Sequence, residues 1–200
     1  MISIIHTAII FYKYLKRKII RVNIKNLELE GVLELKPKLF DDERGYLYEN
    51  YNIKNVISIL GEGISFKQQN IVFNKKGVIR GLHFQKPPNE QGKLISVLSG
   101  KIFDVVLDIK KNSKTFGKHI SIVLDSYKKN ILWIPPGYAH GFQSLDEETL
   151  VQYNMTEIYN PELECSINYN DPQLDIDWPI KSDILVSEKD KDAKNLEELA

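Results

Sequence analysis

The chain has 200 residues, of which 42% are hydrophobic and 27% charged, and its lysines and arginines balance its aspartates and glutamates at 27 each. This length is sufficient to bury a hydrophobic core, and zero formal net charge argues against a general nucleic-acid-binding protein, which carries a basic surface. The single cysteine, Cys165, excludes an internal disulfide and a thiolate metal site.

Residues 1–21 form a prefix that differs from the rest of the chain. Met1–Tyr12 is almost wholly apolar, and four basic residues follow within Lys13–Lys18. A secretory signal has the opposite order of basic and apolar residues, and the run is shorter than the ~20 residues that cross a membrane as a helix. The alternatives are an amphipathic surface helix and a start codon assigned too far upstream. We favour the second, and expect one domain over residues 22–200.

From Val22 onward the pattern predicts one short helix and many short strands. A strand is expected at Leu27–Leu35, and a helix at Asn52–Leu60, where apolar residues recur with helical spacing. Further strands are expected at Ile71–Phe73, Val78–Phe84, Leu94–Leu98, Ile102–Ile109, His119–Leu124, Ile131–Ile134 and Leu150–Met155. The polar tail is expected to end in a helix near Ala193–Leu199. Short strands without intervening helices predict an antiparallel β-sandwich or barrel.

Arg80, His83 and Lys93 lie within one short, otherwise apolar part of these strands. Charged groups on buried strands are costly unless paired, so they are expected to line a cavity. A histidine alone is more often structural, but its two cationic neighbours favour a functional site here. Strict alternation places Arg80 and His83 on opposite faces. Either a bulge at Gly81 brings both into one cavity, or Arg80 reaches a neighbouring pocket.

A second histidine, His140, lies between Ala139 and Gly141 on a strand that follows a proline-rich corner. Small neighbours allow a ligand to approach, although a barrel corner with a packed histidine fits the same pattern. A catalytic metal needs three or four converging ligands, commonly with a His-x-His pair. His83 lacks such a pair, and His6 and His119 are remote in sequence. We therefore expect no metal.

Together these runs resemble the dTDP-4-dehydrorhamnose 3,5-epimerases, enzymes of deoxysugar and polysaccharide biosynthesis. The resemblance covers about residues 27–199. It rests on Asp42–Gly45, Arg80–Gln85, Gln91–Leu94, Phe103–Asp108, Thr115–Gly117, Pro135–Phe142, Asp171-Pro172, Asp177–Pro179 and Ser187–Asp190. It implies an all-β, cupin-type double-stranded β-helix or jelly-roll barrel with a few short peripheral helices. It also implies a cytoplasmic homodimer without a metal or an organic cofactor.

The resemblance also implies catalytic roles. Epimerisation next to a ketone removes a carbon-bound proton from one face and returns a proton to the other. His83 matches the family's base, and a base for this task needs a pKa near the working pH, which is the ordinary range of histidine. Asp190 matches the carboxylate that orients it. Asp171 and Asp104 are rivals for this orienting role. Lys93 would stabilise the enolate oxygen, and Tyr153 would be the acid.

The implied substrate-binding residues are Arg44, Glu49, Gln68, Asn70, Arg80, His140, Tyr159, Glu164 and Lys189. Among them, Arg80 suits a diphosphate, and Tyr159 would stack on the thymine ring. The chain departs from the family pattern at Val72 and Asn74, which replace two hydroxyl residues. It also lacks the lysine that often follows the family's tyrosine, here Tyr153.

The expected function is therefore an isomerase. It would invert C3 and C5 of dTDP-4-dehydro-6-deoxy-D-glucose to give dTDP-4-dehydro-L-rhamnose. Its expected partner is that dTDP-linked 4-keto sugar, with no nucleic acid and no membrane. The alternatives are an epimerase that inverts one centre or acts on another nucleotide sugar, a non-catalytic sugar-binding barrel, and a metal-dependent barrel oxygenase.

Overall fold

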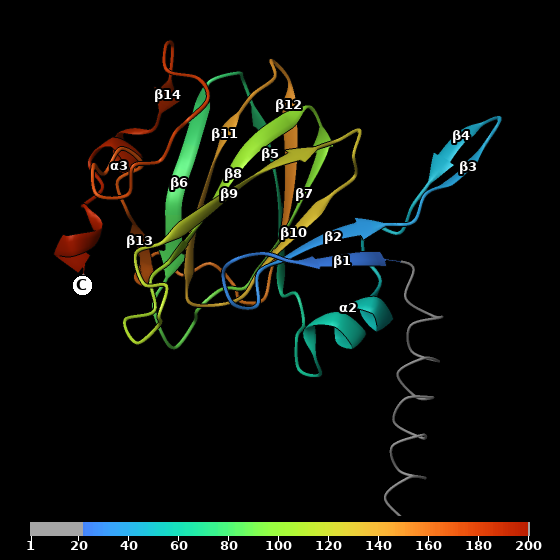
Figure 1. Cartoon of the computed structure of the whole chain (residues 1–200), viewed down its shortest axis with the longest axis horizontal. Coiled ribbons are helices and arrows are strands. Elements are labelled where there is room, and N and C mark those ends of the chain that lie inside the picture. The colour runs from blue at the N-terminus through green and yellow to red at the C-terminus, as the bar shows by residue number, and fades with distance from the viewer. Residues whose placement is uncertain (1–21, 200) are drawn as a thin grey trace, which may run out of the picture.

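The computed structural model describes residues 22–199, and the prefix 1–21 lies outside them. Two antiparallel sheets pack face to face (Figure 1). The first contains, in spatial order, β1 (Val22–Asn26), β2 (Leu33–Pro37), β10 (Ile131–Ile134), β7 (Lys93–Ser99), β12 (Thr149–Met155) and β5 (Gln68–Asn74). The second contains β13 (Glu164–Ser166), β6 (Val78–Gln85), β11 (Tyr138–Ser144), β8 (Lys101–Asp108) and β9 (His119–Asp125), with β14 (Leu185–Val186) parallel to β6.

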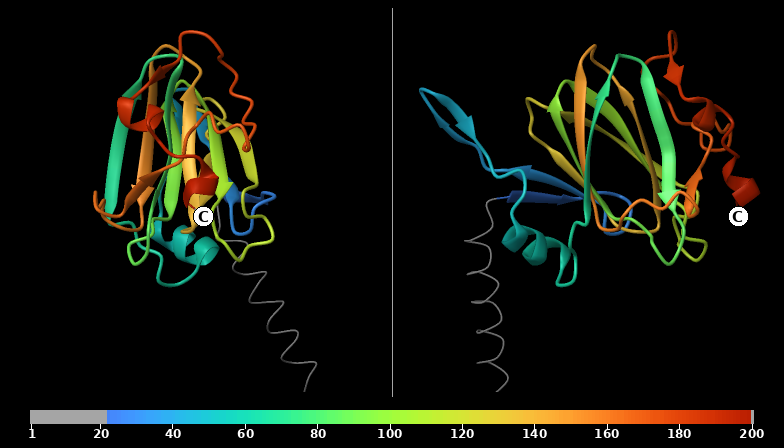
Figure 2. Two further views of the ribbon diagram at one scale, coloured as in Figure 1. Left: turned by 90° about the vertical axis from the view of Figure 1, so that its left-hand side faces the viewer. Right: turned by 180° about the vertical axis from the view of Figure 1, so that it is seen from behind.

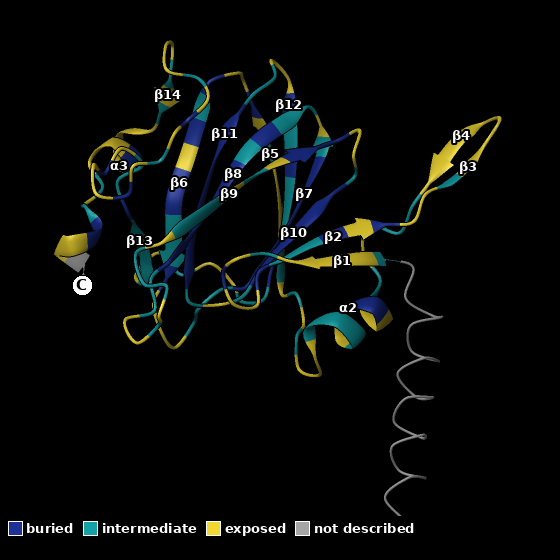
Figure 3. Cartoon of the chain, viewed as in Figure 1, coloured by how far each residue is buried: buried dark blue, intermediate teal, exposed yellow. Residues whose placement is uncertain are grey.

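The main core lies between the two sheets, where alternate residues of each strand meet. Ile95 and Val97 of β7 face Val106 of β8 and Phe142 of β11, and all four are buried. Strand alternation sends the intervening residues to the outer faces, and Figure 3 shows the buried residues concentrated along the facing strands. The arrangement confirms the predicted all-β jelly roll with few helices.

The predicted helix is confirmed as α2 (Ile53–Leu60), which begins after the N-cap residue Asn52. The Asn52 side chain accepts a hydrogen bond from the Lys54 backbone N–H, which satisfies one of the free donors of the first turn. Ile59 and Leu60 of the helix pack on the outer face of the first sheet, against Trp133. The helix therefore covers part of the sheet surface behind the barrel interior.

The single strand predicted at Leu27–Leu35 is wrong, because this segment contains a turn between β1 and β2. Leu29 and Val32 of the turn are fully buried in the main core. The sequence pattern alone conceals the turn, because leucines stand at alternate positions on both sides of it, at Leu27, Leu29, Leu33 and Leu35. Gly31 follows Leu29 by two residues and has a φ of 76°, which reverses the chain direction.

A two-stranded hairpin, β3 (Phe40–Asp42) and β4 (Gly45–Leu47), projects from the barrel, as Figures 1 and 2 show. It was not among the predicted strands. At its turn, the Asp42 carboxylate accepts hydrogen bonds from the backbone and guanidinium N–H groups of Arg44. The hairpin side chains Tyr46 and Leu47 are 56% and 64% exposed.

The C-terminal tail packs on the outer face of the second sheet and contains α3 (Glu188–Lys191) and a 3-10 helix (Leu196–Leu199). The helix expected over 193–199 is thus shorter and of the 3-10 type. Trp178 and Leu196 are buried against Ile79 and Val105 of the sheet. This packing brings α3 beside β6, at the edge of that strand with which β14 pairs. Within residues 22–199, no helix is long and apolar enough to cross a membrane.

Candidate active site

A break in the regular pairing of β6 places Arg80 and His83 in the same cavity. His140 of β11 pairs with His83, whereas Phe142, two residues later, pairs with Arg80, three residues away on β6. The extra residue on β6 makes a bulge, so Arg80 and His83 face the same side of the sheet, which strict alternation would not allow. Gly81 permits it, because its φ is +112° and a Cβ would lie 2.6 Å from the His140 carbonyl oxygen. Of the two alternatives at this strand, the bulge is the one observed.

The cavity has an empty volume of about 750 Å³, counting the space at its mouth, and opens between the two sheets. Of the residues expected at the site, it is lined by Asn70, Arg80, His83, Lys93, His140, Tyr153, Tyr159 and Glu164. These residues come from several strands of both sheets and from the loop that carries Tyr159. The tertiary structure therefore brings together most of the predicted side chains.

His83 is held by Asp190. Its Nε2 lies 2.6 Å from Asp190 Oδ1, so Nε2 donates to the carboxylate and Nδ1 keeps the free lone pair. The other Asp190 oxygen accepts the Gly81 backbone N–H at 3.3 Å. Burial alone would raise the pKa of Asp190, but its hydrogen bonds with His83, Gly81 and Ser187 outweigh that effect and hold the pKa below its usual value. The carboxylate is therefore charged at neutral pH.

The two rival carboxylates have other partners. Asp171 accepts hydrogen bonds from the backbone N–H groups of Gln173 and Leu196 and so fastens the tail. Asp104 is fully buried, and its Oδ2 lies 2.9 Å from Nε2 of His140. The cavity therefore contains two separate histidine–aspartate pairs.

Lys93 brings a buried cation to the floor of the cavity. Its ammonium group donates to the His83 carbonyl oxygen at 3.0 Å, and the residue is only 8% exposed. Burial lowers the pKa of Lys93 to about 8, although the negative charges of Asp104 and Glu164 oppose this change. Near neutral pH the group is a poorly solvated positive charge, which stabilises an adjacent anion strongly.

Tyr153 faces the cavity from the opposite sheet to His83. It belongs to β12 of the first sheet, whereas His83 belongs to β6 of the second. Its ring packs edge-on to His140, with ring centroids 6.5 Å apart. Burial raises the pKa of the Tyr153 phenol well above its usual value, and the positive charge of Arg80 opposes this only in part. The phenol therefore keeps its proton at neutral pH and is suited to donate it.

Arg80 is positioned by Asn74, one of the two residues that depart from the family pattern. Asn74 is buried, and its Oδ1 accepts a hydrogen bond from Arg80 Nε at 2.7 Å. The amide nitrogen of Asn74 donates to the carbonyl oxygens of Val72 and Thr149. This leaves the terminal guanidinium nitrogens of Arg80 available to a ligand.

A chain of hydrogen bonds joins the residues at the rim. Glu164 accepts hydrogen bonds from the Tyr159 hydroxyl and from Lys189. These bonds outweigh the effect of burial and lower the pKa of Glu164. Gln68 accepts the Tyr159 backbone N–H at 2.7 Å and donates to Asn70 at 3.1 Å. Tyr159 is 46% exposed, so its ring is accessible to a planar ligand.

Arg44 and Glu49 do not line this cavity. Arg44 lies at the turn of the β3–β4 hairpin, and its side chain is 85% exposed. Glu49 lies near α2, where its carboxylate accepts a hydrogen bond from Asn52. Within residues 22–199 of one chain, these two predicted substrate-binding residues are separate from the others.

Four lining residues were absent from the predicted set: Val72, Gln91, Phe142 and Met155. Phe142 directly follows the His140-Gly141 pair that the sequence does single out, and Gln91 precedes Lys93 by two residues. Val72 and Met155 are ordinary apolar strand residues, and no sequence signal separates them from the core. No group of three or more histidine, cysteine, aspartate or glutamate residues in the described range has the arrangement of a metal site.

Comparison with known proteins identifies the family. Residues 26–198 match the family model described as dTDP-4-dehydrorhamnose 3,5-epimerase. The Escherichia coli K12 protein of that name is 43% identical over 178 residues, which cover 89% of this chain and 96% of the relative.

Solved structures give the same result. An epimerase from Legionella pneumophila in complex with dTDP-4-keto-L-rhamnose is 42% identical with a TM-score of 0.86, over 90% of this chain and 95% of that one. A 3'-monoepimerase from Streptomyces bikiniensis in complex with dTDP-quinovose is 29% identical with a TM-score of 0.82, over 86% and 89% of the two chains. This chain belongs to the dTDP-4-dehydrorhamnose 3,5-epimerase family.

Proposed function

We propose that this protein is an isomerase that inverts C3 and C5 of dTDP-4-dehydro-6-deoxy-D-glucose and forms dTDP-4-dehydro-L-rhamnose. The observation that supports this proposal most directly is that His83 and Tyr153 enter one cavity from opposite sheets. A base on one wall and a proton donor on the other can act on the two faces of a sugar ring held between them. Family membership supplies the substrate class.

Each inversion requires a balanced exchange of protons. Nδ1 of His83 takes the proton from the carbon next to the ketone, and the electron pair moves onto the C4 oxygen as an enolate. The Lys93 ammonium stabilises that oxygen. The enolate then collapses, and the carbon takes the hydroxyl proton of Tyr153 on the opposite face. The imidazolium returns its proton to solvent, and the phenolate regains one, before the second centre reacts.

The remaining residues hold the substrate. The guanidinium of Arg80 pairs with the diphosphate, and the accessible ring of Tyr159 stacks on the thymine. The rim at which Tyr159 lies is held by a chain of hydrogen bonds that includes Glu164, Lys189, Gln68 and Asn70. His140 is held by Asp104 through Nε2, so its Nδ1 accepts a hydrogen bond from a sugar hydroxyl. The reaction as written uses no metal and no organic cofactor.

We also propose that the active protein is a homodimer. Arg44 and Glu49 lie outside the cavity of their own chain, and the hairpin that carries Arg44 projects from the barrel (Figure 2). The hairpin exposes Tyr46 and Leu47, and β5 exposes Ile71 and Phe73. Exposed apolar side chains on a projecting hairpin and on an edge strand are typical of an interface. A second copy would cover them and bring its own Arg44 to the substrate. We place this enzyme in the cytoplasm, where nucleotide sugars are made.

The function is tested by proton NMR of the purified protein with dTDP-4-keto-6-deoxyglucose in D2O, beside a His83→Ala control. Deuterium at both C3 and C5 with the wild type, and at neither with the variant, is the expected result. Exchange at one carbon alone identifies a single-centre epimerase, as in the Streptomyces bikiniensis relative. An absence of exchange contradicts the proposed substrate, and a panel of other nucleotide sugars would then follow.

A further inference from the structure

A second cavity lies behind the wall that carries His83. The next residue on β6, Phe84, points away from the catalytic cavity, as strand alternation requires. This second cavity is formed where β6 and β8 end, where β11 begins, and where the C-terminal tail crosses the sheet. It has an empty volume of about 1020 Å³, counting the space at its mouth, and none of its lining residues also lines the catalytic cavity.

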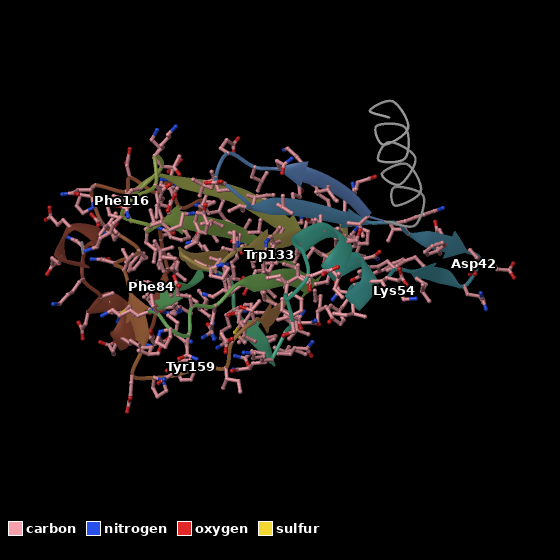
Figure 4. The ribbon with its side chains drawn as sticks, turned by 90° about the horizontal axis from the view of Figure 1, so that it is seen from below. Asp42, Lys54, Phe84, Phe116, Trp133 and Tyr159 are labelled. Atoms are coloured by element: carbon pink, nitrogen blue, oxygen red, sulfur yellow. The ribbon has the colours of Figure 1, made fainter. Side chains whose placement is uncertain are left out.

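The walls of this cavity are mainly apolar. Phe84, Phe116 and Ile109 are half-buried, whereas Ile167 and Leu196 beneath them are 0% and 8% exposed. Figure 4 shows Phe84 and Phe116 at the same end of the barrel, far from the hairpin that carries Asp42. Ligand sites are typically concave, mainly apolar and of roughly 300–1,000 Å³. The part of this cavity that water-sized molecules can occupy, about 420 Å³, lies within that range. In shape and lining the cavity resembles such a site more than a packing defect.

The charged groups around the cavity are mostly positive. Lys86, Lys110 and Lys111 line it, together with a single carboxylate, Glu90. Within residues 22–199, Lys86 and Lys111 form no ion pair and are exposed at the mouth. The cavity therefore combines an apolar floor with two uncompensated cations, which complement an anionic group on an apolar body.

Lys110 is fixed in place, unlike the two lysines at the mouth. Its ammonium group lies 3.6 Å from the centroid of the Tyr138 ring and 3.7 Å from Asp108 Oδ2. Gly137 makes room for its stem, because a Cβ there would lie 2.9 Å from Lys110 Cγ. The backbone at this corner is thus shaped to hold a cation against the cavity wall.

We propose that this cavity binds a small organic anion with an aromatic body. The aromatic ring would pack against Phe84 and Phe116, and the anionic group would pair with Lys86 and Lys111. The proposal does not depend on the proposed epimerase activity, because no residue lines both cavities.

Phenyl phosphate is a suitable probe, and NMR titration of the ¹⁵N-labelled full chain locates where it binds. The expected result is a saturable shift of the backbone amides of Phe84, Phe116 and Gly137. Inorganic phosphate lacks the ring and benzyl alcohol lacks the charge, so each should bind at least about fivefold more weakly. Equal affinity for inorganic phosphate, or shifts confined to residues of the catalytic cavity, would overturn the proposal.

Charge reversal provides the matched test. The double variant Lys86→Glu with Lys111→Glu should weaken phenyl phosphate binding at least about fivefold, since two exposed ion pairs are lost and two repulsions gained. Lys128→Glu changes an exposed lysine outside the cavity and should leave the affinity unchanged. Both variants alter exposed side chains, so folding should be preserved. An unchanged affinity in the double variant would refute the assignment.

Discussion

His83 and Asp190 are 107 residues apart in the sequence, yet the imidazole Nε2 and the carboxylate Oδ1 lie 2.6 Å apart. The connection is made because the C-terminal tail packs across the back of the second sheet and brings α3 to β6. Ser187 caps α3 and accepts the Asp190 backbone N–H at 3.2 Å, which fixes the direction of the carboxylate. The bulge at Gly81 turns His83 toward it. Two separate features of the fold therefore set one hydrogen bond.

Replacing Asp190 by asparagine should lower kcat by about 10²- to 10³-fold, because the amide lacks the negative charge that orients and stabilises the imidazolium. An amide oxygen can still accept the Gly81 N–H, but the charged hydrogen bond to His83 is lost, so Tm should fall modestly. Steady-state kinetics with the 4-keto sugar measure the effect. Asp192→Asn, at an exposed position just beyond α3, is the matched control. Equal activity of the two variants would remove Asp190 from the mechanism.

Tyr153→Phe should separate proton removal from inversion. The ring packing against His140 and Phe142 is retained, but the donor to the second face is lost. We expect product formation to fall by about 10²-fold or more, while deuterium from D2O still enters the substrate through His83 without inversion. NMR of the recovered substrate distinguishes these outcomes. Product formation at the wild-type rate would show that another group is the acid.

The pKa of Lys93, lowered to about 8 by burial, should set the alkaline limit of activity. As pH rises through about 8 the ammonium loses its proton, and with it the charge that stabilises the enolate, so kcat should fall above that pH. Lys93→Arg, in which the charge persists to higher pH, should move the limit upward even if its maximum is lower. A pH–rate profile whose alkaline limb is the same in both proteins would contradict this assignment.

The contribution of Lys93 to the free energy of unfolding should depend on pH in the opposite sense to kcat. The unfolded state holds the Lys93 proton up to its ordinary pKa of 10.5, whereas the folded state releases it near 8. Between these values the unfolded state binds more protons, so the contribution of Lys93 to stability rises with pH. Urea unfolding of the wild type and of Lys93→Met, at about pH 7.5 and about pH 10, compares the two ends of this window. Relative to Lys93→Met, the free energy of unfolding of the wild type should be higher at the higher pH than at the lower one.

Gly81→Ala should damage both stability and activity. A Cβ at this position would lie 2.6 Å from the Gly141 Cα, and the φ of +112° disfavours any side chain. We expect a loss of at least about 2 kcal/mol in the free energy of unfolding. Gly63→Ala is the matched control, since Gly63 also has a positive φ but a Cβ there would meet no atom within 4 Å. Comparable losses in both variants would mean that backbone conformation alone, and not the bulge contact, is responsible.

Complementation tests the proposed dimer. Arg44→Ala and His83→Ala should each be nearly inactive alone. If Arg44 acts on the cavity of the partner copy, mixed dimers contain one cavity with both residues intact, and activity should recover to about a quarter of the wild-type value after subunit exchange at equal ratio. Unfolding and refolding the mixture provides the exchange, and refolding each variant alone is the control. A mixture that stays inactive would place Arg44 at the cavity of its own chain, and an Arg44→Ala variant that is fully active alone would remove Arg44 from the reaction.

The fold class followed from local signals. Short apolar runs punctuated by glycine, proline and asparagine predict strands in whatever tertiary context they occur, and most of the predicted strands agree with the structure to within a few residues. The helix at Ile53–Leu60 was also predictable, because its spacing and its Asn52 cap are local. The turn before β2 was not, because Leu27, Leu29, Leu33 and Leu35 alternate along the sequence as they would in one continuous strand.

The sequence by itself determined the types of chemical group available: a histidine, a lysine, a tyrosine and several carboxylates in recognisable runs. Only the tertiary structure decided which of them meet. It paired Asp190 with His83 and Asp104 with His140, turned Arg80 into the cavity through a bulge, and left Arg44 on a projecting hairpin. The physical reason is that a residue's type is local, whereas its orientation and partners depend on strand register and on packing between segments far apart in the chain.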